Sequence, residues 1–295
     1  MLTSLFVAAR IVANPISNVF QKQLAQQSAE PLFIIGATHA LLTPVCVLLL
    51  LDPSRLHVAQ GFWIDIIIAA ALAVSGNVLL VYALRSGDLS VLGPINAYKA
   101  LVSLVLGIVL IGEIPTAMGI AGMLLIITGS YFVLESGATP GDGSAFARFA
   151  RNPGVQLRFA ALALSATEAV FLKKALLLSS PLTTFLLWCL LGLPLAAAAA
   201  GVLLRDRLRD QIALLRRHWR TYLWLALTTG VMQLTTLFAF GKLQVGYALA
   251  LFQLSALISV VLGYRYFQER HIRKRLLGAA VMVAGAALIV TLGRR

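Results

Sequence analysis

The sequence predicts an all-α membrane protein in which ten transmembrane helices form two inverted five-helix repeats around a central cavity. Three observations support this fold class. Of the 295 residues, 60% are hydrophobic and only 12% are charged, a composition that a soluble domain of this size does not tolerate. The apolar residues fall in windows of about 20, which is the length of a membrane-spanning helix. One long stretch of the sequence also occurs twice.

The ten expected spans follow from these apolar windows. Because open sheet edges cannot lie in lipid, each window is expected to form a helix. The longest polar gap runs from Glu135 to Pro153 and is rich in Gly, Ser, Asp and Pro, which predicts a linker. We therefore expect a first repeat over residues 1–135, a linker over 136–155 and a second repeat over 156–295. The expected spans are 2–20, 31–51, 62–84, 90–111, 114–134, 157–178, 182–204, 221–241, 246–266 and 275–292.

The duplication is clearest between residues 95–129 and 251–285, which align without a gap at an offset of 156 residues. Nine positions are identical, and the pairs Gly122/Gly278, Gly129/Gly285 and Glu113/Glu269 are among them. A bias toward leucine and alanine does not produce such pairs, so we infer an internal duplication. An odd number of spans in each copy forces the two copies into opposite orientations. A solute site then commonly lies at mid-membrane between them.

The net charge of +13 comes from Lys and Arg that lie almost entirely in the breaks between apolar windows. Such cations are typical of topology and headgroup signals, so no nucleic-acid partner is expected. Loops after odd-numbered spans hold most of them, which predicts that these loops are cytoplasmic and that both termini are outside. The arginine-rich residues 205–220 are either a topology signal or a short basic helix on anionic headgroups.

Polar residues at membrane depth define the candidate binding site. The first span carries a polar residue at every fourth position from Arg10 to Lys22, which places these side chains along one helix face. An ionisable side chain at the centre of a span costs about 2.5–3.5 kcal/mol, so it normally faces a cavity or a partner. We expect Arg10 and Lys99 to hold an anionic group while amides orient the solute. The predicted substrate-binding residues are Arg10, Asn14, Asn18, Asn77, Asn96, Lys99, Gln233 and Gln253.

Several of these side chains have a second interpretation. Glu168, the acid that lies clearly inside a span, is a candidate either for proton coupling or for a permanent ion pair with Arg10 or Lys99. The whole polar set could also serve only to join helices through ion pairs and hydrogen bonds. Glu113 and its repeat partner Glu269 are predicted to cap hairpins, because carboxylates are favoured near helix N-termini.

Smaller and isolated residues inside the spans are expected to be structural. The repeated glycines of the fifth and tenth spans, such as Gly122 and Gly129, are predicted to form helix-packing faces, since small residues let backbones approach closely in lipid. His39 is expected to be a satisfied structural residue. Cys46 and Cys189 both lie in apolar windows, so no structural disulfide is expected.

The repeat motifs resemble those of the drug/metabolite transporter (DMT) superfamily, in particular its ten-helix EamA-type members. The resemblance rests on Gly-Asp-Leu-Ser-x-x-Gly-Pro-Ile at residues 87–95, Gly-Glu-Ile-Pro-Thr at 112–116 and the following helix with Gly122 and Gly129. The second copy keeps Glu269 and the glycines but departs from the Gly-Glu-Ile-Pro-Thr motif on both sides of Glu269. The resemblance implies a pseudo-symmetric bundle that works by alternating access without ATP.

The resemblance also implies a range of solutes. Family members export amino acids and other small metabolites, and relatives in organelles exchange sugar phosphates and nucleotide sugars. Small four-helix relatives use a Glu in their first helix for proton-coupled drug export, whereas this chain has Arg10 and Asn14 in that region and no acid. Many ten-helix members keep both termini in the cytoplasm, which conflicts with the charge distribution of this sequence.

The favoured function is secondary-active transport, in particular export, of an amino acid or other carboxylate- or phosphate-bearing metabolite across the inner membrane of a bacterial cell. The alternatives are a flippase for a lipid-linked or amphipathic solute and a proton-coupled drug exporter. The sequence contains no H-E-x-x-H motif and no P-loop, so no enzymatic activity, cofactor or metal is expected. The expected partners are the solute, the lipid bilayer and protons as a candidate coupling ion. A monomer or a homodimer is expected.

Overall fold

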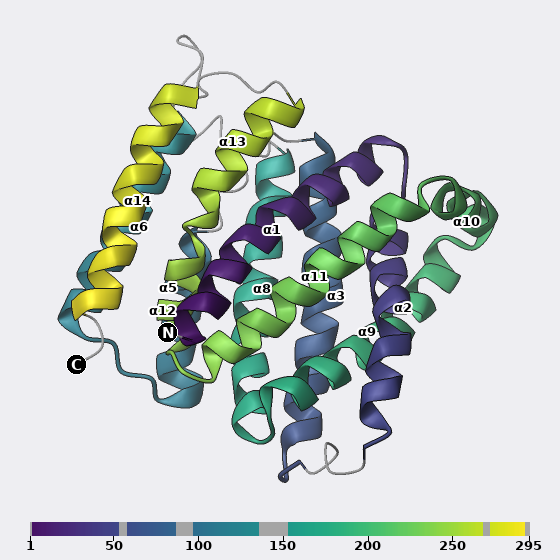
Figure 1. Ribbon diagram of the computed structural model, residues 1–295, viewed down its shortest axis with the longest axis horizontal. Coiled ribbons are helices and arrows are strands. Elements are labelled where there is room, and N and C mark those ends of the chain that lie inside the picture. Colours follow the sequence, from purple (N-terminus) through teal and green to yellow (C-terminus); the bar gives the residue numbers. More distant parts are fainter. Residues whose placement is uncertain (1, 53–57, 87–96, 136–152, 268–271, 293–295) are drawn as a thin grey trace.

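The computed structural model describes residues 2–52, 58–86, 97–135, 153–267 and 272–292 (Figure 1). Within these ranges the regular structure is helical, in agreement with the predicted all-α class. Five of the described helices are long and apolar enough to cross a membrane, judged by length and composition. The first half contains α1 (Leu2–Gln26), α2 (Pro31–Leu50), α3 (Phe62–Ser86), α5 (Ala97–Ile111) and α6 (Ala117–Glu135). The second half contains α8 (Pro153–Leu177), α9 (Pro181–Leu203), η2 (Arg205–Arg207), α10 (Leu208–Arg217), α11 (Trp219–Phe240), α12 (Val245–Phe252), α13 (Ser255–Phe267) and α14 (Ile272–Leu292).

Local sequence explains where several helices begin and end. α2 and α9 both begin with a proline in the first turn, a position where the missing N–H of proline has no intrahelical partner to lose. The hydroxyl of Ser180 also accepts a hydrogen bond from the Thr183 N–H and caps α9. α5 ends at Ile111, and the next residue, Gly112, has a φ of 75°, a conformation that glycine adopts without steric cost.

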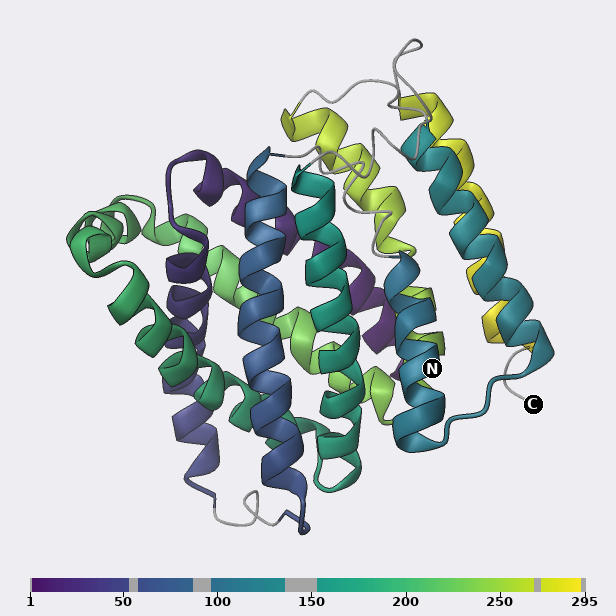
Figure 2. The same ribbon diagram turned by 180° about the vertical axis from the view of Figure 1, so that it is seen from behind.

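Helices at equivalent positions of the two halves pack against each other in opposite directions. α6 and α14 lie side by side at one edge of the molecule (Figure 2). The backbone at Gly129 of α6 approaches Gly278 of α14, and Gly285 of α14 approaches Gly122 of α6, so the two helices are antiparallel. α2 and α9 are also antiparallel, since Gly36 and His39 of α2 lie opposite Ala196 and Gly192 of α9, respectively. The two halves are therefore inverted copies, as the duplication predicts.

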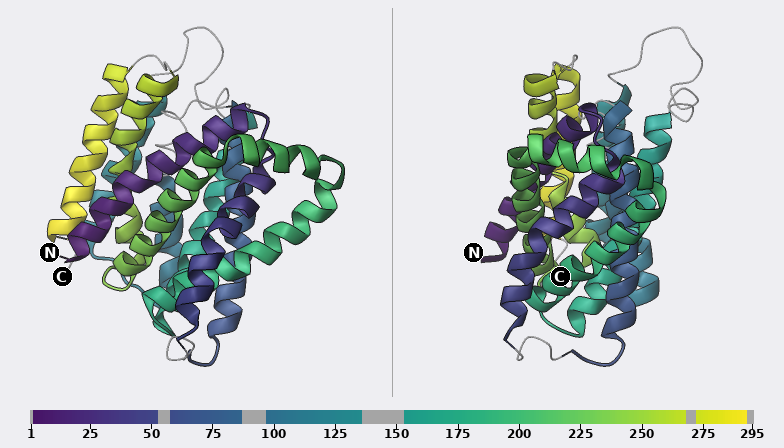
Figure 3. Two further views of the ribbon diagram at one scale, coloured as in Figure 1. Left: turned by 45° about the vertical axis from the view of Figure 1, so that its right-hand side comes forward. Right: turned by 90° about the vertical axis from the view of Figure 1, so that its right-hand side faces the viewer.

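The remaining inter-half pairs follow the same symmetry. α1 packs against α11, and α3 packs against α8 (Figures 1 and 3). Because α1 corresponds to α8 and α3 to α11 in the repeat, exchanging the two halves converts one pair into the other. The halves thus interdigitate, and the space between them is bounded by helices from both.

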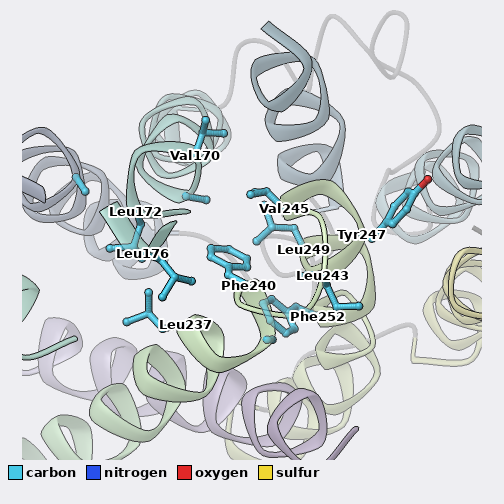
Figure 4. Packing of buried hydrophobic residues seen from close by; sticks show 14 of the residues in the cluster. Val170, Leu172, Leu176, Leu237, Phe240, Leu243, Val245, Tyr247, Leu249 and Phe252 are labelled. Atoms are coloured by element: carbon cyan, nitrogen blue, oxygen red, sulfur yellow. The ribbon is translucent and has the colours of Figure 1, made fainter. Parts of the chain in front are cut away.

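Buried apolar side chains of α8, α11 and α12 form a core beside this space (Figure 4). The rings of Phe240 and Phe252 are stacked with centroids 6.3 Å apart, and Leu176 and Leu237 pack with them in the same cluster. Phe240 also lines the central cavity described below. The core therefore forms one wall of that cavity.

One prediction about helix boundaries was wrong. The ninth span was expected as one helix over 246–266, but it is divided into α12 and α13 at Gln253 and Leu254. Both residues of this break donate their N–H groups three residues back, to Ala250 and Leu251, which satisfies the backbone locally. In the fourth span the described helix is α5, which begins at Ala97. Ala97 is the repeat equivalent of Gln253. Residues 90–96 of that expected span lie outside the described residues.

The arginine-rich segment after α9 also forms helices. η2 and α10 connect α9 to α11 at the flank of the molecule (Figure 1). Gln211 of α10 is buried and accepts a hydrogen bond from the Glu30 N–H at 2.8 Å, while the Arg207 guanidinium lies 2.7 Å from the Glu30 carboxylate. These contacts fasten α10 to the turn between α1 and α2.

Candidate functional site

A cavity of about 90 Å³ lies between the two halves. Side chains of α1, α2, α3, α5, α8, α9, α11 and α12 line it. The predicted binding residues that the structure places on this cavity are Arg10, Asn14, Asn18, Asn77, Lys99 and Gln233. One described residue among those predicted does not line the cavity. Gln253 is buried at the α12–α13 break, its amide donates back to the Leu249 carbonyl at 3.3 Å, and it does not line the cavity. Asn96 lies outside the described residues.

Arg10 is held at the centre of the site by contacts with the second half. Its side chain is 8% exposed, and its Nε donates a hydrogen bond of 2.8 Å to Thr236 Oγ1 on α11. The guanidinium carbon lies 4.9 Å from the centroid of the Phe252 ring, a cation–π distance. The guanidinium Nη1 is buried without a hydrogen-bond partner. One end of the group is thus fixed while a donor remains available.

The other polar residues of α1 join the two halves along the same face. Asn14 Nδ2 donates to Ser255 Oγ at 3.3 Å, and the hydroxyls of Ser17 and Thr229 are 2.9 Å apart. Lys22, the last residue of the predicted stripe, is buried but does not line the cavity. Members of the stripe therefore line the cavity and also hydrogen-bond across the interface, so both interpretations of the sequence remain.

A mixed group of charges occupies the middle of the cavity. Glu168 on α8 is 7% exposed and interacts electrostatically with Lys99 and with Arg10. Lys99 in turn lies close enough to Arg10 and Arg158 for their positive charges to act on it. Three cationic side chains and one carboxylate thus line the described part of the cavity.

Arg158 is a correction to the sequence interpretation, which had counted it among the loop cations. It lies in the second turn of α8, is 5% exposed and lines the cavity. The pattern that could have located it is the seven-residue spacing of Arg158, Ser165 and Leu172, which all line the cavity and which a helix places on one face. Arg158 lies only five residues after the first residue of α8, so in the sequence it resembled a cation that contacts lipid headgroups at the end of a span.

Trp188 on α9 is a second cavity residue that sequence reasoning missed. The ring of His39 packs against it with centroids 4.7 Å apart, and His39 Nδ1 is 3.1 Å from the Cys189 carbonyl oxygen. These contacts hold the imidazole in place beside the indole, and His39 also lines the cavity. A side chain at position 192 would collide with the His39 ring, so Gly192 makes room for this arrangement. Cys46 and Cys189 are both buried and free.

Four polar atoms of the cavity lining are buried without a hydrogen-bond partner. Three of them are N–H donors, namely Arg10 Nη1, Trp188 Nε1 and Gln233 Nε2, and the fourth is the acceptor Gln21 Oε1. The Trp188 and Gln233 side chains lie beside the Glu168 carboxylate, but their donors make no hydrogen bond to it within 3.5 Å. A buried donor without a partner costs about 1–3 kcal/mol. A concentration of such donors in one cavity indicates a place for an acceptor-rich ligand.

A second ionic cluster lies where the α5–α6 loop meets the second half. Glu113 Oε2 accepts a hydrogen bond of 2.8 Å from the Val245 N–H. Glu113 therefore caps α12 of the other half, whereas it was predicted to cap its own hairpin. Lys173 Nζ lies 3.9 Å from Glu113 Oε1 and donates to the carbonyls of Phe240 and Leu243. Burial raises the pKa of the Glu113 carboxyl above its ordinary value of 4.5, against the opposing effects of the Val245 N–H and of Lys173. Glu269 lies outside the described residues.

The model of the EamA-like transporter family matches residues 3–135 and 152–291, which together include most of the chain. The chain belongs to the EamA-like transporter family. It is accordingly an integral, multi-pass membrane protein of a family of transporters. No curated protein matches the chain.

A solved structure described as "Crystal structure of protein" shares the fold. Its TM-score is 0.70 and its sequence identity 16%, over 99% of this chain and 98% of that chain. A likeness at this level of identity carries information on the fold alone. The family therefore supports transport, and the identity of the solute has to come from the cavity.

Proposed function

We propose that the chain is a secondary-active transporter of a small organic anion that carries a carboxylate or phosphate group. It moves the solute across the bacterial inner membrane by alternating access, with export as the favoured direction. In this proposal ten spans form two inverted units, over residues 1–135 and 156–295, joined by a linker over 136–155. The cavity between them opens to one side of the membrane at a time, as expected of inverted-repeat transporters.

The observation that carries the proposal is the set of unpartnered donors in a cavity rich in positive charge. Arg10 Nη1, Trp188 Nε1 and Gln233 Nε2 are buried, come from three different helices and line one cavity. Carboxylate and phosphate oxygens are acceptors of the kind that these donors lack, and hydrogen bonds with a charged partner are roughly twice as strong as neutral ones. A cationic drug would instead meet Arg10, Lys99 and Arg158 in the same cavity.

Uptake of candidate solutes into liposomes that contain the purified protein tests this function. We expect counterflow of small organic acids or phosphate esters, and we expect Arg10→Ala and Lys99→Ala each to reduce it at least tenfold. Lys242→Ala is the matched control, because Lys242 is an exposed cation outside the cavity lining. The assignment of the site is refuted if both cavity variants transport the preferred solute at the rate of the control.

A further inference from the structure

The Glu168 carboxylate is already surrounded by groups that satisfy a negative charge. Lys99 on α5 and Arg10 on α1 attract it, and the side chains of Trp188 on α9 and Gln233 on α11 lie beside it with N–H groups. The charge of Glu168 is therefore balanced by the site's own cations, whereas the Trp188 and Gln233 N–H groups beside it make no hydrogen bond to it.

This arrangement leaves no charged acceptor for an amino group of the solute. Among the described residues that line the cavity, Glu168 is the carboxylate and Arg10, Lys99 and Arg158 are the permanent or protonated cations. An ammonium group that approached Glu168 would come close to Lys99 and Arg10, and like charges in a water-poor interior repel each other strongly. A carboxylate or phosphate group in the same place gains from both cations.

One acceptor of the described cavity lining, an uncharged amide oxygen, is buried without a hydrogen-bond partner. Gln21 Oε1 is buried, lines the cavity and has no hydrogen-bond partner. Gln21 is eleven residues from Arg10 on α1, which corresponds to about 16 Å along the helix axis. A hydroxyl group of a solute long enough to reach this oxygen can donate a hydrogen bond to it. The cavity thus has a cationic region near Arg10 and a neutral acceptor toward Gln21.

From these contacts we propose that the cavity selects small organic anions that lack an amino group, such as hydroxy acids and hydroxylated phosphate esters, and that it discriminates against amino acids. This selection rests on the proposed function, since it assumes that the cavity binds the transported solute. It goes further in naming the chemical group that the cavity excludes.

Matched pairs of solutes that differ in one group test the selection. Lactate and alanine differ only in a hydroxyl in place of an ammonium group, and 2-hydroxyethyl phosphate and phosphoethanolamine form the corresponding phosphate pair. Binding to the full chain in lipid nanodiscs is measured by isothermal titration calorimetry, and counterflow is measured in liposomes. We expect the hydroxyl member of at least one pair to bind at least tenfold more tightly than its amine counterpart and to be transported preferentially.

The variant Glu168→Gln separates the two roles that this carboxylate could have. If it balances the cations, Glu168→Gln keeps or strengthens binding of the hydroxyl member and keeps the preference against the amine. Glu30→Gln is the control, since it removes a carboxylate that lies outside the cavity lining and is paired with Arg207. A cooperative thermal unfolding transition shows that each variant is folded. Where a variant does not fold, the solute pairs measured on the unmodified protein still decide whether the cavity discriminates against an amino group.

The outcomes are distinguishable. Tighter binding of the amine members, lost selectively in Glu168→Gln, overturns the inference but leaves a transporter of amino compounds. Equal binding within each pair overturns the inference as well. If neither member of either pair binds or is transported by folded protein, and other organic anions are also inactive, the proposed function itself is refuted.

Discussion

The contact between α6 and α14 allows a quantitative test of the packing between the two halves. A Cβ atom at Gly129 would lie 2.6 Å from the Gly278 carbonyl oxygen and 2.8 Å from the Met282 nitrogen. Carbon–oxygen contacts normally begin near 3.3 Å, and these are backbone atoms, so Gly129→Ala requires the helices to separate by about 0.7 Å. Overpacking of this kind costs about 1–3 kcal/mol. We therefore expect Gly129→Ala to lower the thermal unfolding temperature by several degrees.

Gly201→Ala is the matched control for this prediction. Gly201 is also inside a helix, but a Cβ there meets no atom within 4 Å, and alanine is favoured over glycine in a helix by about 1 kcal/mol. Its unfolding temperature should be unchanged or higher. Gly285→Ala should behave as Gly129→Ala does, and the double variant should lose less than the two single losses together, because one separation of the helices relieves both clashes.

These effects can be measured on detergent-solubilised protein. Each variant is heated, and unfolding is followed as the loss of its monodisperse peak in size-exclusion chromatography. The reasoning is refuted if Gly129→Ala is as stable as Gly201→Ala, since the measured backbone approach would then have no energetic consequence. If the double variant loses as much stability as the two single variants together, only the coupling through a shared separation of the helices is refuted.

Three further predictions concern the two polar clusters. Because burial raises the pKa of Glu113 above 4.5, the stability linked to its proton is fully present below pH 4.5 and is lost as the pH rises through the raised pKa. The unfolding temperature of the unmodified protein, relative to that of Glu113→Gln, should therefore fall as the pH rises above 4.5. A difference between the two proteins that does not change with pH would contradict this. Tyr247→Phe removes the hydrogen bond of 2.8 Å that the Thr116 N–H donates to the Tyr247 hydroxyl. It should lower the free energy of unfolding by about 1 kcal/mol, measured by thermal unfolding, while solute affinity stays the same. Unchanged stability would show that this hydrogen bond contributes nothing. Arg158→Gln should weaken binding of a phosphate-bearing solute at least fivefold in calorimetric titrations of protein that unfolds at the unmodified temperature, and equal affinity would place Arg158 outside the binding site.

The sequence predicts the features of this molecule that depend on periodicity. Apolar windows locate the helices, and the repeat pairs Gly122/Gly278 and Gly129/Gly285 locate the packing face, because close approach of backbones in lipid requires small residues. The four-residue spacing from Arg10 also predicts a polar face on α1, and the structure places most of that face on the cavity. These features are local to one helix or repeated in both halves, so the sequence alone records them.

Features that depend on how the halves meet could not be predicted in the same way. Arg158 lies near the start of a helix, and only the packing of α8 against α3 shows that its side chain is buried. Trp188 is an apolar residue among apolar residues, and its role depends on the unpartnered indole N–H that faces the cavity. Glu113 caps α12 of the opposite half, whereas proximity in sequence favoured its own hairpin.

The division between α12 and α13 has a mechanical consequence for transport. An uninterrupted helix bends only by breaking hydrogen bonds in its middle, which is costly in lipid. Here the N–H groups of Gln253 and Leu254 are satisfied three residues back, so the chain has an elbow at that point. In the alternating-access cycle that we propose, α13 would swing about this elbow while α12 stays in the apolar core beside Phe240. Tilting of this half-helix would then open one side of the bilayer without disrupting the wall that seals the other.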